Sequence, residues 1–210
     1  MWAPSYAATT DLAGWLGVVI DPEFAGPIEA ASRAIDQATG RQFGLTASQT
    51  REYEPDWHHG RAYVKTHDMA AVPTLVETVS ADGTVIDTIT NFVVTPRNAV
   101  QDGQPYTGIE YGGFGGNSWY GGFGYCYPHP STRLVRVTAE FGWAEIPDPI
   151  KLATLIQAAR WNERREYVGG PLTKQKVDDL EYGWAAGGSR ELDPDVAAIV
   201  APFRRVWAAV

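Results

Sequence analysis

The hydrophobic pattern of this chain changes from a helical period to an alternating period and then back again. Residues 21–40 carry apolar side chains at helical spacing, and so do residues 149–168. Between them, residues 133–143 (RLVRVTAEFGW) alternate, with Val135, Val137 and Ala139 on one face. A period of 3.6 residues marks a helix with one buried side, and a period of two marks a half-buried strand. The sequence therefore predicts an α+β fold, in which a small helical bundle from the N- and C-terminal zones encloses a β-rich insertion.

Asp-Pro pairs place the starts of the predicted helices. Asp21-Pro22, Asp148-Pro149 and Asp193-Pro194 each combine a good N-cap with a proline whose missing N–H costs nothing in the first turn. We expect helices over residues 21–40 and 149–168, and a short N-terminal helix capped by Thr9 or Thr10. A helical core would then comprise residues 1–44 and 143–210. The last helix would carry these residues on one side: Val196, Ile199, Val200, Phe203 and Trp207.

Turn signals divide the predicted β-rich insertion, residues 45–142. Asp82-Gly83 lies between two alternating runs and predicts a hairpin. Further along the chain, residues 172–184 fit either a single short strand or a hairpin, and the pattern leaves both open.

Residues 110–130 (EYGGFGGNSWYGGFGYCYPHP) consist largely of glycine and aromatic residues. A phosphate-binding loop is disfavoured because no lysine lies between Lys65 and Lys151, and such loops need one just after their glycines. A stacking platform for sugars or bases and a loop ordered by neighbouring subunits both remain open. We favour the subunit-contact loop, because loops of this length often belong to interfaces. The candidate contact residues are Phe114, Trp119, Tyr120, Phe123 and Tyr125.

The spacing of histidine, cysteine and serine residues in the sequence does not match a catalytic or metal-binding motif. His58 and His59 are adjacent, so on a strand they would point to opposite faces and could not readily share a metal ion. Cys126 has no basic neighbour to lower its pKa, although His129 lies three residues away. There is no G-x-S-x-G nucleophile motif. The sequence predicts no enzymatic activity, no metal and no cofactor.

The charge balance limits the possible partners. The chain has 25 acidic and 17 basic residues and a net charge of −8, which argues against a general binder of the phosphate backbone. No apolar run approaches the ~20 residues that a membrane-spanning helix needs. Near the C-terminus, however, arginine and aromatic residues lie side by side, a composition favoured at protein interfaces. These candidate interface residues are Phe203, Arg204, Arg205 and Trp207.

The order of several segments resembles a known family. Residues 29–44 (EAASRAIDQATGRQFG), 93–111 (VVTPRNAVQDGQPYTGIEY), 141–166 (FGWAEIPDPIKLATLIQAARWNERRE) and 192–207 (LDPDVAAIVAPFRRVW) resemble the head-to-tail connector, or adaptor, proteins of long-tailed bacteriophages. The resemblance spans nearly the whole chain and rests on the order of the segments. The β zone and its Gly/aromatic loop are larger here than in the shorter members of that family.

The resemblance implies a structural role in the neck of the virion. Connector subunits form a ring, expected to be dodecameric, beneath the portal protein. The ring extends the DNA channel and receives a stopper or tail-completion protein, and DNA passes through without specific binding. The resemblance places assembly in the host cytoplasm and makes the C-terminal end the candidate portal contact. The alternative from the residues alone is a carbohydrate-binding or adhesion module on the β insertion, with Trp119 and Tyr120 as platforms.

Overall fold

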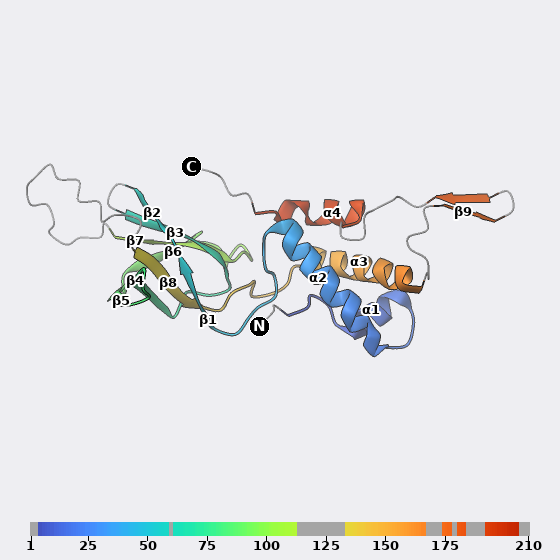
Figure 1. The fold of residues 1–210 in the computed structure, drawn as a ribbon, viewed down its shortest axis with the longest axis horizontal. Coiled ribbons are helices and arrows are strands. Elements are labelled where there is room, and N and C mark those ends of the chain that lie inside the picture. The colour runs from blue at the N-terminus through green and yellow to red at the C-terminus, as the bar shows by residue number, and fades with distance from the viewer. Residues whose placement is uncertain are drawn as a thin grey trace, which may run out of the picture. The chain divides into compact units, whose positions relative to one another are not determined.

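A computed structural model describes residues 4–58, 61–112, 133–166, 174–177, 180–183 and 192–205. For residues 58, 133, 164–166, 174–177 and 180–183 it describes the backbone only. The chain divides into two compact units, a helical unit (Met1–Gly44 and Ile146–Val210) and a β unit (Leu45–Glu145) (Figure 1). The fold is α+β, as the change of period predicts.

The first helix of the helical unit is α1 (Thr9–Leu16), and its N-cap is Ala8. The expectation that Thr9 or Thr10 caps this helix was wrong, because both threonines lie inside its first turn. The physical reason is Asp11, whose carboxylate accepts a hydrogen bond from the Ala8 N–H at 2.8 Å. An acidic side chain at the third helical position satisfies the N-terminal donor from inside the helix.

The second helix starts as the sequence predicts. Asp21 caps a 3₁₀ turn, η1 (Pro22–Phe24), and its side chain accepts from the Glu23 N–H at 2.9 Å. The turn leads into α2 (Ala25–Thr39), which Gly40 ends at a φ of 65°. Pro27 fits without a break, because it lies in the first turn of α2, where backbone N–H groups have no intrahelical acceptor.

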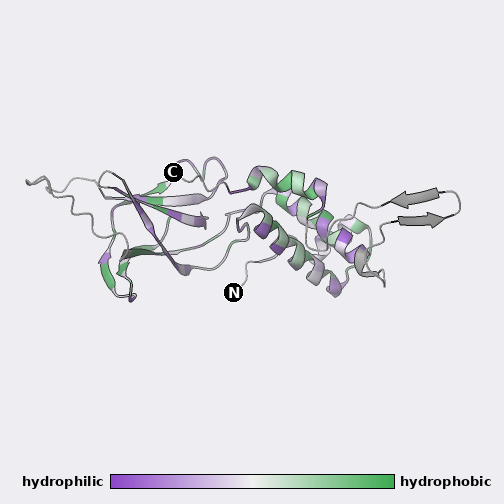
Figure 2. Ribbon diagram, turned by 45° about the horizontal axis from the view of Figure 1, so that its top comes forward, coloured by the Kyte–Doolittle hydropathy of each residue, from purple (hydrophilic) through white to green (hydrophobic). Residues whose placement is uncertain are grey.

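The C-terminal zone adds two α-helices, α3 (Asp148–Glu166) and α4 (Pro194–Val200), and a 3₁₀ turn, η3 (Ala201–Phe203). Helices α2 and α3 bury their apolar faces together with that of α1. These helices carry hydrophobic and hydrophilic residues along their length (Figure 2). One-sided patterning of this kind is what a small bundle requires. The shared core contains Leu12, Ala13, Phe24, Ile28, Ala31, Ala158 and Ala159.

Between α3 and α4, strands β9 (Lys174–Val177) and β10 (Leu180–Gly183) pair antiparallel. This pairing decides between the two alternatives for residues 172–184, because the segment contains a hairpin.

The β unit contains two four-stranded antiparallel sheets. The first has the order β1 (Gln49–Tyr53), β8 (Arg133–Ala139), β4 (Leu75–Ser80) and β5 (Val85–Thr88). The second has the order β2 (Pro55–His58), β3 (Arg61–Met69), β7 (Tyr106–Tyr111) and β6 (Phe92–Thr95). Only Glu54 separates β1 from β2, so the chain changes sheets within one residue.

The two sheets share one core, which is built from the alternating faces of their strands. On β8, Val135, Val137 and Ala139 are buried, as the alternation predicts. They pack in one cluster with residues of the other sheet, including Val64 and Ile109. Burial of alternate residues from two sheets is the arrangement of a β-sandwich.

The predicted hairpin forms, but its second run does not continue as one strand. Asp82 and Gly83 lie in the turn between β4 and β5, and Gly83 has a φ of 84°. The chain then leaves the first sheet after Thr88 and enters the second sheet at Phe92, as β6. As a result β5 is an edge strand, and Val85 and Ile86 remain exposed on it.

Candidate functional site

The predicted C-terminal interface residues do not lie on one continuous helix. Helix α4 ends at Val200, and the η3 turn ends at Phe203. The backbone of Arg204 is extended, with φ −58° and ψ 133°. Arg204 and Arg205 therefore do not continue the helix. Trp207 lies outside the described residues, so the expectation that it shares one side with Phe203 stays a prediction. The signal was present in Pro202, because a proline supplies no N–H for continuing an α-helix.

Phe203 belongs to an aromatic cluster of the helical unit. Its ring meets the ring of Phe43 edge-on, with centroids 5.8 Å apart. Phe43 is fully buried and meets Tyr6 in the same geometry at 5.7 Å. Edge-to-face pairs of this kind add to the stability that burial provides. Phe203 therefore helps to hold the η3 turn in place.

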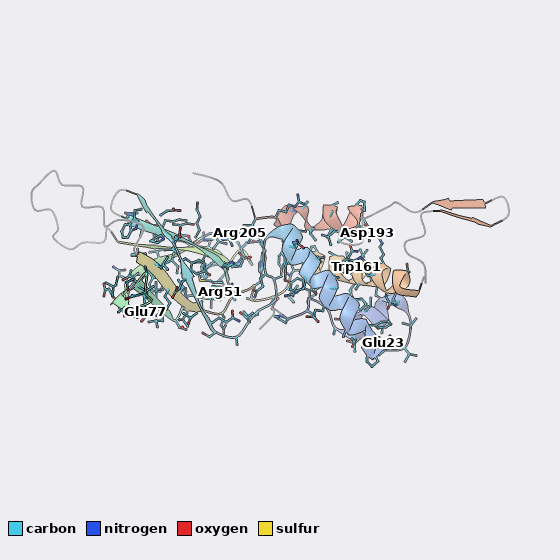
Figure 3. The ribbon with its side chains drawn as sticks, viewed as in Figure 1. Glu23, Arg51, Glu77, Trp161, Asp193 and Arg205 are labelled. Atoms are coloured by element: carbon cyan, nitrogen blue, oxygen red, sulfur yellow. The ribbon has the colours of Figure 1, made fainter. Side chains whose placement is uncertain are left out.

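Arg204 and Arg205 lie at the C-terminal end of α2. The Arg204 Nε donates to the Ala38 carbonyl at 3.2 Å, and the Arg205 N–H donates to the Thr39 carbonyl at 2.8 Å. Arg205 is labelled in Figure 3. The last carbonyls of a helix lack intrahelical donors and carry partial negative charge, so a guanidinium there is favourable. The Arg204 side chain remains exposed, and it presents a positive charge to solvent.

A polar network connects the N-terminal segment to α2. The Tyr6 hydroxyl donates to Asp36 and accepts from the Phe43 N–H at 2.9 Å. Arg33 pairs with Asp36 at 3.2 Å and lies over the Tyr6 ring at 5.6 Å. Burial raises the pKa of Asp36 to about 6, although the Tyr6 hydrogen bond and the Arg33 charge both act to lower it. Burial and the Asp36 charge also raise the pKa of Tyr6.

Helix α3 is joined to α4 by charged and polar side chains. Arg160 makes two contacts of 2.6 Å with Asp195 and a third, at 3.4 Å, with Asp193. Gln157 is fully buried; its Nε2 donates to Asp193 at 3.2 Å, and its Oε1 accepts from the Asp193 N–H at 3.0 Å. The Arg160 hydrogen bond lowers the pKa of Asp195. Asp193 thus precedes α4 as predicted, but its side chain binds Gln157 instead of capping the helix.

A second surface escaped the sequence reasoning. Trp15 is 52% exposed, Val18 52%, Val19 88% and Ile20 55%. These residues lie on the last turn of α1 and in the connection to η1. The signal was the run Val18-Val19-Ile20, which follows a helix-ending glycine and contains no polar residue. We call residues 15–20 the apolar segment.

The Gly/aromatic candidates lie outside the described residues, namely Phe114, Trp119, Tyr120, Phe123 and Tyr125. The structure does describe one flank of that segment. Tyr111, the last residue of β7, pairs with Phe92 and meets the Trp57 ring edge-on at 6.0 Å. The other flank enters β8, where Arg133 pairs with Ser80. The segment therefore connects the two sheets, and the carbohydrate-binding alternative, which depends on Trp119 and Tyr120, stays a prediction.

Comparison with known proteins gives a likeness to a solved structure. No family model matches the chain, and no curated protein matches it. A solved structure of the neck of an empty GTA particle, computed with C6 symmetry, contains a similar chain. The match covers 98% of this chain and 93% of that one, with a TM-score of 0.55 and 16% identity. The likeness is one of fold. It includes both the helical unit and the β unit, because the match covers 98% of the chain.

The described residues show no cluster of side chains that could form a metal centre. Among them, no three His, Cys, Asp or Glu side chains gather closely enough to hold a metal ion. His67 Nδ1 lies 3.0 Å from the Tyr53 hydroxyl, and their rings are in contact. His59, Cys126 and His129 lie outside the described residues. No described helix is both long and apolar enough to cross a membrane.

Proposed function

We propose that the chain is a structural subunit of the neck of a phage-like particle, a head-to-tail connector. In this role it forms a ring beneath the portal protein, extends the DNA channel and joins the head to a stopper or tail-completion protein. The observation that carries the proposal is the likeness of fold to a chain from the neck of a GTA particle, a phage-like gene transfer agent. That likeness covers nearly the whole of both chains, so it concerns the combination of a helical unit and a β unit.

The charges of the described residues suit a channel through which DNA slides. Several of the described basic side chains contact a carboxylate, which partly neutralises their charge: Arg33, Arg61, Lys65, Arg136 and Arg160. A DNA-binding surface instead needs cations free to displace the counterions of phosphate groups. With a net charge of −8, the subunit would repel DNA more than retain it. This supports passage of DNA without specific binding.

The C-terminal residues remain our candidates for the portal contact. Arg204 is exposed, and a hydrogen bond holds its side chain at the end of α2, so its positive charge has a defined position on the surface. Phe203 anchors the preceding turn, and Trp207 extends the segment beyond the described residues. An acidic rim on the portal would complement this end. For the contact between subunits we retain the Gly/aromatic segment, and for the ring we retain twelve subunits.

Electron microscopy of the protein mixed with the portal protein of its own particle tests the proposal. We expect a ring of additional density on one end of the portal, coaxial with the channel. The same protein mixed with a portal from an unrelated particle is the control. Absence of ring density and of co-sedimentation with the cognate portal would contradict the connector role.

A further inference from the structure

Most of the apolar segment is exposed to solvent on the helical unit. Leu12 and Ala13, which precede the segment, and Leu16 within it pack into the core of the helical unit. The next three large side chains, Val18 to Ile20, all point out of that core, and Val19 is 88% exposed. Single exposed apolar residues are ordinary, but a contiguous group on one short segment indicates an interaction site.

The backbone holds the apolar segment in a defined shape. Gly17 ends α1 in the left-handed region, with a φ of 68°, and the Val18 N–H donates to the Ala13 carbonyl at 3.1 Å. At the other end, the Asp21 side chain accepts from the Glu23 N–H and starts η1. Because both ends are fixed, a partner that binds here pays little to order the segment.

The charges around the apolar segment select its partner. Asp11 lies one helical turn before Trp15, and Asp21 and Glu23 follow Ile20 (Glu23 is labelled in Figure 3). The sequence contains no lysine or arginine before Arg33. A surface of anionic lipid would be repelled by these carboxylates. The complementary surface is apolar with a positive charge beside it.

The chain itself carries such a surface on α3. Among the described residues of the helical unit, Leu152 is the remaining large apolar side chain that is markedly exposed, at 38%. It stands next to Lys151, which is also exposed. Both residues lie in the first turn and a half of α3, whereas α1 packs near Ala158 and Ala159 further along that helix. The Lys151–Leu152 surface therefore lies away from the part of α3 that packs with α1.

We propose that the apolar segment of one subunit docks on the Lys151–Leu152 surface of a second copy of this chain. This inference rests on the proposed function, because in a ring one patch of each subunit contacts a different patch of the next subunit. A head-to-tail contact between such patches closes into a ring when the rotation permits. Apolar side chains then meet Leu152, and the carboxylates of Asp21 and Glu23 face Lys151.

Disulfide trapping tests the contact. The native cysteine is first replaced (Cys126→Ser), and single variants Val19→Cys and Leu152→Cys are made in that background. A disulfide forms only where the two Cα atoms approach within about 7 Å. We expect covalent dimers when the two variants are mixed and oxidised, either free in concentrated solution or assembled on the portal. The Val19→Cys variant oxidised alone, and Val72→Cys mixed with Leu152→Cys, should give no such dimers.

The outcomes separate this inference from the proposed function. Portal-bound rings that yield no mixed dimers would overturn the docking contact and leave the connector role standing. Val19→Cys dimers formed without Leu152→Cys would also overturn it, because they require the same patch on both subunits. Mixed dimers formed by a protein that never binds its portal would support the contact and contradict the connector role.

A charge variant gives a second, independent measure. Val19→Asp should weaken self-association at least tenfold by sedimentation, because a carboxylate would be buried among apolar side chains beside other acidic groups. Val72→Asp is the matched control, since Val72 is a 53% exposed valine of the β unit. Equal association of the Val19→Asp variant and the parent protein would contradict the proposal.

Discussion

The N-terminal segment passes so close to Gly44 that a Cβ there would lie 2.8 Å from the Pro4 carbonyl oxygen. That oxygen is a backbone atom and also accepts from Arg33 at 3.1 Å, so it cannot easily move. We expect Gly44→Ala to lower the free energy of unfolding by about 1–3 kcal/mol, the usual cost of overpacking. Urea unfolding followed by circular dichroism measures it.

Gly14→Ala is the matched control. Gly14 lies within α1, and a Cβ there meets no other atom within 4 Å. Alanine in a helix is more favourable than glycine, so this variant should gain up to about 1 kcal/mol. If both variants change stability in the same direction, the close approach at Gly44 is not a constraint on the fold.

The ionisation of Asp36 gives stability a dependence on pH. Its pKa is about 6 in the folded protein and 3.8 for an ordinary aspartate, so the folded state holds its proton more tightly. The stabilisation is fully present below about pH 4 and is lost as the pH rises through about 6. It amounts to at most about 3 kcal/mol, since each pKa unit corresponds to about 1.4 kcal/mol.

Comparison with Asp36→Asn isolates this group. Asparagine keeps the shape of the protonated side chain and does not titrate in this range. We expect the stability of the parent protein, relative to the variant, to fall between about pH 4 and about pH 7. Urea midpoints measured across that range would contradict the expectation if the two profiles run parallel.

Some residue contacts are visible in the sequence and others are not. Val135, Val137 and Ala139 could be assigned to a buried face, because alternation is a local pattern and their neighbours in the chain define it. The contact between Tyr6 and Asp36 joins residues 30 positions apart, and no local period reports such a pair. The same holds for Gln157 and Asp193, which are 36 positions apart.

Among the elements, the end of α2 and the two residues that follow η3 depend on each other. Arg204 and Arg205 supply donors to the last carbonyls of α2, so the C-terminal segment acts as a cap for another helix. Reversing the charge of both residues places negative charge where the helix already carries it. We expect the Arg204→Glu, Arg205→Glu variant to lose about 0.5–1 kcal/mol of stability and remain folded.

The same variant tests the proposed portal contact. If the arginines face an acidic portal rim, charge reversal should weaken portal binding more than tenfold, because like charges then oppose each other. Arg97→Glu, at an exposed position of the β unit, is a control for reversing an arginine charge elsewhere, and it makes half of the change in net charge. Unchanged portal binding, measured by co-sedimentation, would show that Arg204 and Arg205 serve α2 alone.

The start of α2 was readable because its signal is local. Asp21 and Pro22 determine where η1 and α2 begin through one side-chain bond and one fixed dihedral angle. The switch from β5 to β6 was not readable, since residues 85–95 are rich in β-branched residues throughout and only tertiary pairing assigns them to different sheets. The Gly/aromatic candidates stay predictions, as they lie outside the described residues.

At the scale of the whole molecule, the described residues of the helical unit and of the β unit each build a core of their own. One cluster joins α1, α2 and α3, and the other joins the two sheets of the β unit. The sequence shows the succession of helical and alternating periods, which is why an α+β fold was predictable. An interaction surface could not be predicted in the same way, because a surface such as the apolar segment is recognised only once burial in the subunit is known.

Separate cores predict separate unfolding transitions. Ile28→Ala removes a buried side chain from the helical core, and Val137→Ala does the same in the β core. Each truncation should cost about 2–4 kcal/mol. We expect scanning calorimetry of the free subunit to show two transitions, of which Ile28→Ala lowers one and Val137→Ala lowers the other. For units of this size the shift should be roughly 10 °C or more. A single transition that both variants lower together would show instead that the two units unfold as one.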